Sequence, residues 1–286
     1  MAKTHITILV ENTARGPGLL AEHGLAYWIE HGGQQVLIDS GQGQVLVGNA
    51  FKLGIVLSQI DALVLSHGHY DHTGGVVDAL RMNQSVVVYA HPAASAPKYA
   101  RQSDGSAREI GMSHMAKKAI WEPHHRLVAT DRPTVVCEAL TATGPVPRLT
   151  DFEDTGGPFF LDPGCMQADP LEDDQSVFLD TTEGTVVLLG CAHSGVINTL
   201  RYIRQLTRDR PIRAVLGGMH LGDASPLRIA RTIEEFQQLG VQQLAPAHCT
   251  GLPATVALWN AFPGQCLPCH VGAKFEFETL PCSLNL

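Results

Sequence analysis

Short apolar runs alternate with polar turns along the first third of the chain, a pattern typical of β-strands. The runs predicted as strands are residues 6–10, 25–30, 36–38, 62–65 and 86–90. Residues 31–35 contain two adjacent glycines and are typical of a hairpin connection. Apolar residues at helical spacing predict helices over 45–53 and 76–82, the first ending at Gly54.

The same alternation returns in the second half of the chain. Strands are predicted at 134–140, 176–180, 185–189, 213–216, 244–246 and 274–278. Helices are predicted at 196–207 and 226–239, the second ending at Gly240. Strands and helices mixed in both halves indicate a layered α/β fold, which we expect to form a single domain over residues 1–286.

Residues 91–132, between the two α/β regions, have a different sequence pattern. Proline and glycine interrupt every periodic segment there, at Pro92, Pro97, Gly105, Gly111 and Pro123. Long structured excursions from a scaffold often carry binding residues, so we expect a lid-like insertion within the domain. Residues 150–174, rich in Pro, Gly and Asp, are predicted as loop.

The composition excludes several classes of protein. Hydrophobic residues make up 44% and charged residues 17%, a globular balance, and the net charge is −8. No chain-wide basic surface for nucleic acid is present, and no apolar run approaches the ~20 residues that span a membrane. Because the seven cysteines are scattered and the N-terminus resembles a strand and not a signal peptide, we expect a cytoplasmic protein. The composition leaves open whether it forms a homo-oligomer.

Histidine is the unusual residue, with fourteen in the chain. Three of them and one carboxylate occupy six consecutive positions directly after the strand predicted at 62–65: His67, His69, Asp71 and His72. Imidazole nitrogens and carboxylate oxygens are ligands for Zn, Fe or Mn. Because His67 and His69 are two positions apart, their side chains can point to one metal position. Asp71 and His72 can point to a second position nearby.

Three further histidines follow predicted strands in the second half. His193 follows the strand 185–189, His220 the strand 213–216, and His248 the run 244–246. Each is flanked by small residues, and ligands bind at the carboxyl ends of strands in α/β sheets. One such histidine alone is typical of a buried structural residue, whereas the repetition favours metal ligands.

His67-x-His69-x-Asp71-His72 resembles the signature of the metallo-β-lactamase-fold superfamily. Further segments are similar to its branch of dihydropterin-aminobenzene-phosphate synthase-like proteins. These segments are residues 9–12, 37–41, 143–148, 173–175, 190–199 and 248–251. The resemblance implies a four-layer αββα sandwich with two divalent metal ions at the sheet edges.

The resemblance also implies the ligands. His67, His69 and His193 would hold the first metal, and Asp71, His72 and His248 the second. The metals would be zinc foremost, with manganese or iron as alternatives. Asp39 is expected to orient a ligand imidazole through its other N–H.

A carboxylate bridges the two metals in many superfamily members, but this chain has Gly217-Gly218-Met219-His220 at the expected place. Either His220 replaces it as a terminal ligand, or Asp223 reaches back, or hydroxide alone bridges. We favour His220, because it directly follows the strand.

A two-metal centre activates water for hydrolysis of an ester, amide or phosphoester. We therefore expect a metal-dependent hydrolase of a small anionic substrate, with Asp71 and His220 as catalytic residues. One alternative is a group transferase resembling 7,8-dihydropterin-6-yl-methyl-4-(β-D-ribofuranosyl)aminobenzene 5'-phosphate synthase. A second alternative is an iron-dependent redox enzyme on the same fold.

The insertion supplies basic side chains in an otherwise acidic chain. We expect Lys98, Arg101 and Arg108 to bind a phosphorylated or carboxylated substrate; the alternative is a solvated helical face. The remaining histidines of the insertion are expected on the lid surface: His91, His114, His124 and His125.

Three smaller motifs leave alternatives open. Cys266-x-x-Cys269-His270 matches a c-type haem attachment, or with Cys282 a structural zinc site, but we favour chance or a local redox pair. Asp173-Asp174-Gln175 could contact substrate or hold a loop by hydrogen bonds. Cys191 and Cys249 adjoin predicted ligands and are interpreted as packing thiols.

Overall fold

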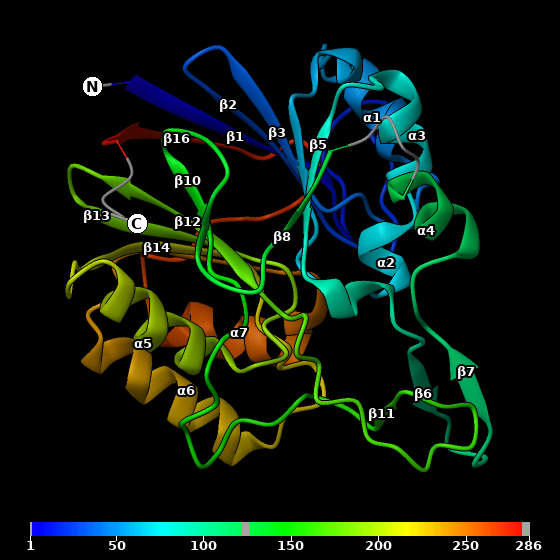
Figure 1. Cartoon of the computed structure of the whole chain (residues 1–286). Coiled ribbons are helices and arrows are strands. Elements are labelled where there is room, and N and C mark those ends of the chain that lie inside the picture. The colour runs from blue at the N-terminus through cyan, green and yellow to red at the C-terminus, as the bar shows by residue number, and fades with distance from the viewer. Residues whose placement is uncertain (1, 122–125, 282–286) are drawn as a thin grey trace.

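The structure is a computed structural model that describes residues 2–121 and 126–281. One large mixed sheet runs through the described residues in the order β15-β14-β13-β12-β16-β1-β2-β3-β4-β5-β8 (Figure 1). Its N-terminal half contains β1 (Ala2–Val10), β2 (Ala26–His31), β3 (Gln34–Ile38), β4 (Ala62–Val64), β5 (Val87–Ala90) and β8 (Arg126–Ala129). Its C-terminal half contains β9 (Thr134–Val135), β10 (Leu140–Ala142), β12 (Ser176–Thr181), β13 (Gly184–Leu189), β14 (Ile212–Gly218) and β15 (Leu244–Ala247). Strand β16 (Lys274–Thr279) pairs with β1 and β12 and so joins the halves.

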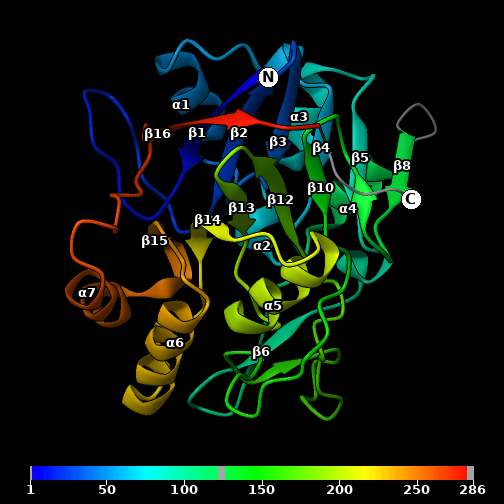
Figure 2. The same ribbon diagram turned by 90° about the vertical axis from the view of Figure 1, so that its left-hand side faces the viewer.

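Three separate buried clusters define four layers. The inner cluster packs the two halves of the sheet against each other and includes Ile8 and Tyr27 from one half and Leu188 and Leu216 from the other. A second cluster covers the N-terminal half with α1 (Leu46–Lys52), α3 (Val76–Met82) and α4 (His114–Ile120). A third covers the C-terminal half with α5 (Val196–Leu206), α6 (Pro226–Gln238) and α7 (Leu252–Ala261). Figures 1 and 2 show the helices on the two outer faces, which confirms the predicted αββα sandwich.

Local sequence explains the element boundaries. The predicted hairpin joins β2 and β3 through Gly32 and Gly33, whose φ angles of 57° and 85° suit a two-residue turn of mirror-image type. Helix α6 begins after Ser225, whose hydroxyl accepts a hydrogen bond from the Arg228 amide at 3.2 Å, and is followed by Gly240 at φ 66°.

The strand directions determine where the site forms. Strands β3, β4 and β5 are parallel, as are β13, β14 and β15, so each set ends at one edge of the sheet. Asp39 follows β3, and the segment 65–69 follows β4 and leads to the short helix α2 (Tyr70–Thr73). His193, His220 and His248 follow the three parallel strands of the other half. Residues far apart in sequence therefore meet at this edge.

Parts of the predicted insertion belong to the scaffold, which corrects its extent. Strand β8 continues the main sheet beside β5, and Ala116 and Ile120 of α4 lie in the second core cluster. Only β6 (Tyr99–Arg101) and β7 (Ala107–Glu109) form a separate small sheet, together with β11 (Phe159–Phe160) from a later loop. Figure 1 shows this sheet projecting from one end of the sandwich. His124 and His125 lie outside the described residues.

Two other expectations also change. The strand predicted at 134–140 is two short strands, β9 and β10, joined by a turn. Helix α7 was not predicted, because its sequence LPATVALWNA is apolar nearly all round and lacks a polar face. Among the described residues, no helix has both the length and the apolar composition needed to cross a membrane.

Gly217 in β14 provides a test of the close packing between the sheet halves. Its φ is 118°, and a Cβ there would lie 2.2 Å from Tyr27 Oη and 2.3 Å from the Leu189 carbonyl oxygen. We expect Gly217→Ala to reduce the free energy of unfolding by about 2–5 kcal/mol, from backbone strain and overpacking.

The matched control is Gly48→Ala, in the exposed middle of α1, where an added Cβ meets nothing within 4 Å. That change should raise stability by about 0.5–1 kcal/mol through helix propensity. Urea unfolding midpoints measure both effects. Equal stability of the two variants would contradict the packing described for β14.

Candidate metal centre

The first group of candidate ligands comes from the loop after β4 and the end of β13. His67 Nε2 lies 2.9 Å from His69 Nδ1, and the His193 ring lies 4.8 Å and 4.9 Å from the two rings. One donor atom from each falls within 4.8 Å of the other two. The loop comes this close to its neighbours because Gly68 has no side chain; a Cβ would lie 2.0 Å from the Ala94 carbonyl oxygen.

The chemistry of this group fits a divalent cation. His193 Nδ1 donates to the Thr155 carbonyl oxygen at 2.8 Å, which leaves Nε2 as an acceptor. His193 Nε2 and His69 Nε2 are buried and have no hydrogen-bond partner among the described residues. Burial lowers the pKa of His69 to about 3 and the pKa values of His67 and His193 well below 6.5. The three imidazoles are therefore neutral, which is the form that binds metals.

A second group lies beside the first. His248 Nε2 is 3.3 Å from Asp71 Oδ2 and 3.3 Å from His72 Nε2. His72 Nε2 is 3.9 Å from the same carboxylate oxygen. Although burial acts in the opposite direction, the charge of His72 and hydrogen bonds from His23 and His248 hold the pKa of Asp71 well below 3.8. An ionised carboxylate beside two imidazoles suits a second cation, whose binding would displace the Nε2 proton of His72.

Buried acceptors orient the rings of both groups. Asp39 Oδ2 lies 2.7 Å from His72 Nδ1 and accepts the Ser66 hydroxyl at 2.6 Å, while Ser66 Oγ lies 3.0 Å from His67 Nδ1. Against the effect of burial, the Asp39 and Asp71 carboxylates raise the pKa of His72 to about 9. Asp39 therefore contacts the His72 ring directly and reaches the His67 ring through Ser66, as a residue that orients candidate ligands would.

His248 has its own orienting partners. Asn12 Oδ1 lies 2.9 Å from His248 Nδ1, and Glu11 Oε1 accepts the His248 amide at 2.8 Å. Both residues stand in a segment that carried the family resemblance, but no role was predicted for them. Four residues around the site hold left-handed backbone: Asp39 at φ 57°, Ala192 at φ 53°, His220 at φ 47° and His248 at φ 50°. Such conformations cost energy and persist where the surroundings enforce them.

His220 lies next to the first group. Its ring is 4.2 Å from the His193 ring, its Nε2 donates to the Gly156 carbonyl oxygen at 3.2 Å, and its buried Nδ1 has no partner among the described residues. Asp223 is exposed and contributes to no cluster of candidate ligands among the described residues. The geometry therefore favours His220 over Asp223 as the additional donor.

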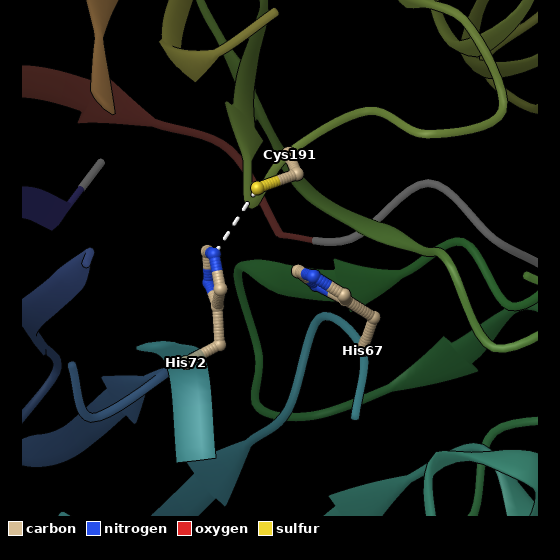
Figure 3. A group of neighbouring side chains, drawn as sticks. All are labelled: His67, His72 and Cys191. Carbon is tan, nitrogen blue, oxygen red and sulfur yellow. Dashed lines mark hydrogen bonds between the residues drawn. The ribbon is translucent and has the colours of Figure 1, made fainter. Parts of the chain in front are cut away.

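Two further residues that contact candidate ligands were not predicted to do so. His23 Nε2 lies 3.1 Å from Asp71 Oδ2, and Cys191 Sγ lies 3.1 Å from His72 Nε2 (Figure 3). His23 comes from the loop before β2, where no strand end or ligand spacing marks it. Cys191 was interpreted as a packing thiol, although its place two residues before His193 at the end of β13 was a usable signal.

A cavity of about 340 Å³ opens onto these side chains. Its lining includes the candidate ligands His69, Asp71, His193 and His248, and from the small projecting region Arg108 and Phe159. Arg108 Nη2 donates to Tyr70 Oη at 2.8 Å and is exposed. Of the three basic residues predicted to bind substrate, Arg108 is the one that reaches the cavity.

The other two have different surroundings. Lys98 is buried, and its Nζ lies 2.9 Å from Asp169 Oδ2 and 2.7 Å from Asp173 Oδ1. Its charge is neutralised inside the protein, which corrects the expectation that it binds substrate. Arg101 Nη2 donates to the Cys165 carbonyl oxygen at 2.6 Å, and its guanidinium lies 4.6 Å from the Phe160 ring centre.

The segment Asp173-Asp174-Gln175 holds the ligand loops by hydrogen bonds. Asp173 Oδ2 accepts the Gly68 amide at 2.7 Å, and Asp174 Oδ2 accepts the Ser194 amide at 2.8 Å. Gln175 Nε2 donates to the Leu65 carbonyl oxygen at 2.8 Å. Burial raises the pKa of Asp174 to about 6. The alternative of hydrogen bonds within loops, rather than substrate contact, is the one that the structure supports.

The Cys266-x-x-Cys269-His270 motif contributes no residue to the lining of this cavity. Cys269 packs against the inner core, Cys266 belongs to the third core cluster, and His270 Nδ1 donates to the Val271 carbonyl oxygen at 2.9 Å. These three residues form no candidate metal cluster among the described residues. Cys282, the further ligand considered for zinc, lies outside the described residues.

Fold and site together define a class of protein, an αββα sandwich with a buried histidine and aspartate cluster at its strand ends. The chain belongs to the metallo-beta-lactamase superfamily, whose family model matches residues 20–248. The predicted family and fold are thereby confirmed.

Individual relatives cover nearly the whole chain. It is 27% identical to the 7,8-dihydropterin-6-methyl-4-(beta-D-ribofuranosyl)-aminobenzene-5'-phosphate synthase of Methanocaldococcus jannaschii, over 90% of both chains. It is 31% identical to an uncharacterized protein of the same organism, over 88% of this chain and 93% of that one. These similarities support the predicted branch.

Among solved structures, the crystal structure of Tm1679, a metal-dependent hydrolase of the beta-lactamase superfamily, superposes with a TM-score of 0.81. The two chains are 30% identical, and the match covers 96% of this chain and 99% of that one.

The Asp39 contact provides a test of how the ligands are oriented. We expect Asp39→Asn to weaken zinc binding by about 10–100-fold, because the His72 ring loses its anionic partner while the side-chain volume stays the same. Asparagine also tolerates the left-handed backbone at this position.

Zinc affinity is measured by competition with a chromogenic chelator. Asp223→Asn, which changes an exposed carboxylate at the cavity rim, is the control and should bind zinc as the wild type does. Unchanged affinity in Asp39→Asn would show that the contact does not position a ligand.

Proposed function

We propose that this protein is a binuclear metal-dependent hydrolase acting on a small anionic substrate, phosphorylated substrates foremost. One observation carries the proposal: two adjacent groups of buried donors face a cavity that also contains an exposed arginine. The similarity to Tm1679 across nearly the whole chain supports the hydrolase class.

The proposed metal ligands follow the two groups. His67, His69 and His193 would hold one divalent cation, and Asp71, His72 and His248 the other, with His220 adjoining the first. Cations held there supply a nucleophilic water at neutral pH and neutralise charge on the attacked or departing oxygen. Zinc is the first candidate, and manganese or iron suits the same donors.

The remaining residues of the cavity attract and position the substrate. Arg108 presents an exposed guanidinium, which pairs well with phosphate or carboxylate oxygens. Tyr70 Oη holds that guanidinium at 2.8 Å, and Phe159 supplies an apolar wall. His23 lies at the rim, 51% exposed and bonded to Asp71, where it can donate to a substrate oxygen. We infer a reducing compartment such as the cytoplasm, because the seven cysteines are scattered along the chain.

A group transferase is the second candidate. It is supported by the similarity to the Methanocaldococcus jannaschii synthase, which extends over 90% of both chains. The branch resemblance implies a pterin diphosphate and an aminobenzene ribose phosphate as its substrates. Both are anionic, so Arg108 would serve either reaction.

Metal analysis combined with two assays tests the proposal. The metal-free protein is loaded separately with zinc, manganese and ferrous iron. We expect two ions per chain and turnover of bis-p-nitrophenyl phosphate that chelation abolishes. Coupling of a pterin diphosphate to an aminobenzene ribose phosphate, with diphosphate released, would select the transferase instead. One iron per chain with oxygen consumption would contradict both.

Arg108 and Arg101 form a matched pair of variants for substrate binding. We expect Arg108→Ala to raise KM for anionic substrates at least tenfold, because a charge-assisted hydrogen bond contributes ~1.5–3 kcal/mol. Arg101→Ala removes a similar charge outside the cavity and should leave KM unchanged. Steady-state kinetics give the KM values of both variants and of the wild type. Equal KM values for Arg108→Ala and the wild type would exclude Arg108 as the anion-binding residue.

A further inference from the structure

We propose that the Cys191 thiolate is a metal ligand placed between the two metal positions, where it can bridge them. The inference rests on the proposed metal-dependent function and adds a sulfur donor to its nitrogen and oxygen ligands. It also supplies the anionic bridging group for which the end of β14 has no side chain.

The position of the sulfur supports this role. Cys191 is 3% exposed, and its Sγ lies 3.1 Å from His72 Nε2 (Figure 3). It joins three clusters in which all donor atoms lie within 4.8 Å of one another. Its partners in them are His67 and His72, His193 and His220, and His248 and Cys249. Those clusters contain members of both proposed ligand groups, so the sulfur lies between the two metal positions.

Glycines on adjacent strand ends let the backbone around Cys191 pack closely. A Cβ on Gly190 would lie 2.1 Å from Ser66 Oγ. A Cβ on Gly218 would lie 2.6 Å from Cys249 Sγ and 3.3 Å from the Cys191 Cα. A side chain at position 218 would therefore collide with Cys249 Sγ, so Gly218 keeps the end of β14 clear beside the two cysteines.

Two imidazole nitrogens without hydrogen-bond partners belong to residues that lie close to the cysteine. His193 Nε2 and His220 Nδ1 are buried without hydrogen-bond partners among the described residues, and both residues share a cluster with Cys191. As a ligand, Cys191 would bind the cation through its thiolate sulfur, and its thiol proton would leave to solvent. A thiolate donor shifts the preference of the site toward zinc or iron and away from manganese.

Cys249 is the matched control. Its Sγ donates to the Cys191 carbonyl oxygen at 3.6 Å, and its residue is half-buried. Among the described residues it joins a single candidate cluster, beside His248. It is the same chemical group, but it joins one candidate cluster where Cys191 joins three.

Zinc X-ray absorption on the zinc-loaded full-length protein tests the assignment. Wild type and Cys249→Ser should bind two zinc ions and show a sulfur shell at about 2.3 Å beside the nitrogen and oxygen shell. Cys191→Ser should lose the sulfur shell. Cys191→Asp should lose it too, yet keep both zinc ions, because a carboxylate restores an anionic donor.

The outcomes separate this inference from the proposed function. Two zinc ions without a sulfur shell in the wild type, or a shell that survives in Cys191→Ser, would overturn the inference and leave the metal-dependent function intact. A shell lost only in Cys249→Ser would also overturn it. A wild-type protein that binds no zinc would overturn both. If the Cys191 variants fail to fold, the wild-type and Cys249→Ser spectra decide, because a shell absent from either contradicts the assignment.

Discussion

The buried Asp39 carboxylate is the contact on which the rest of the site depends. It follows β3 and accepts hydrogen bonds from the Ser66 amide and hydroxyl, and it pairs with the His72 ring of α2. Three segments of the N-terminal half are thereby fixed to one charge. A buried carboxylate is tolerated only when fully paired, so the same contacts that stabilise Asp39 also set the direction of the ligand rings.

The αββα sandwich brings the candidate ligands together from both halves of the chain. The N-terminal half delivers His67, His69, Asp71 and His72 from one loop and the helix after it, and the C-terminal half delivers single histidines from three parallel strands. Glycines let these segments approach closely: Gly190 faces Ser66 of the other half, whereas Gly68 faces Ala94 and Gly218 faces Cys249 within their own halves. The buried Lys98–Asp173 pair then connects the ligand loop to the projecting region through the Gly68 amide.

Much of the fold could be predicted because local patterns determine it. Alternation and helical spacing marked β2, β13, α3 and α5, and the strand-end rule placed the later histidines at the correct edge. Helix α7 and strand β8 were missed, because an evenly apolar helix has no periodicity and a short strand among Pro and Gly resembles loop.

Candidate site residues could be predicted where they share a spacing in the sequence. They could not be predicted where only tertiary contacts bring them to the site. His23 lies on a loop without a pattern, and its role follows only from its 3.1 Å approach to Asp71. Lys98 and Arg108 have the same charge in the sequence, yet burial between two carboxylates separates the first from the cavity that the second lines. Such distinctions depend on how distant segments pack, which residue type and spacing do not encode.

A crystal structure of the zinc-loaded protein, with anomalous data at the zinc edge, tests the central claim most directly. We expect two peaks about 3.5–4 Å apart, one within bonding distance of His67, His69 and His193 and the other of Asp71, His72 and His248. A single peak, or peaks bound elsewhere on the chain, would contradict the account.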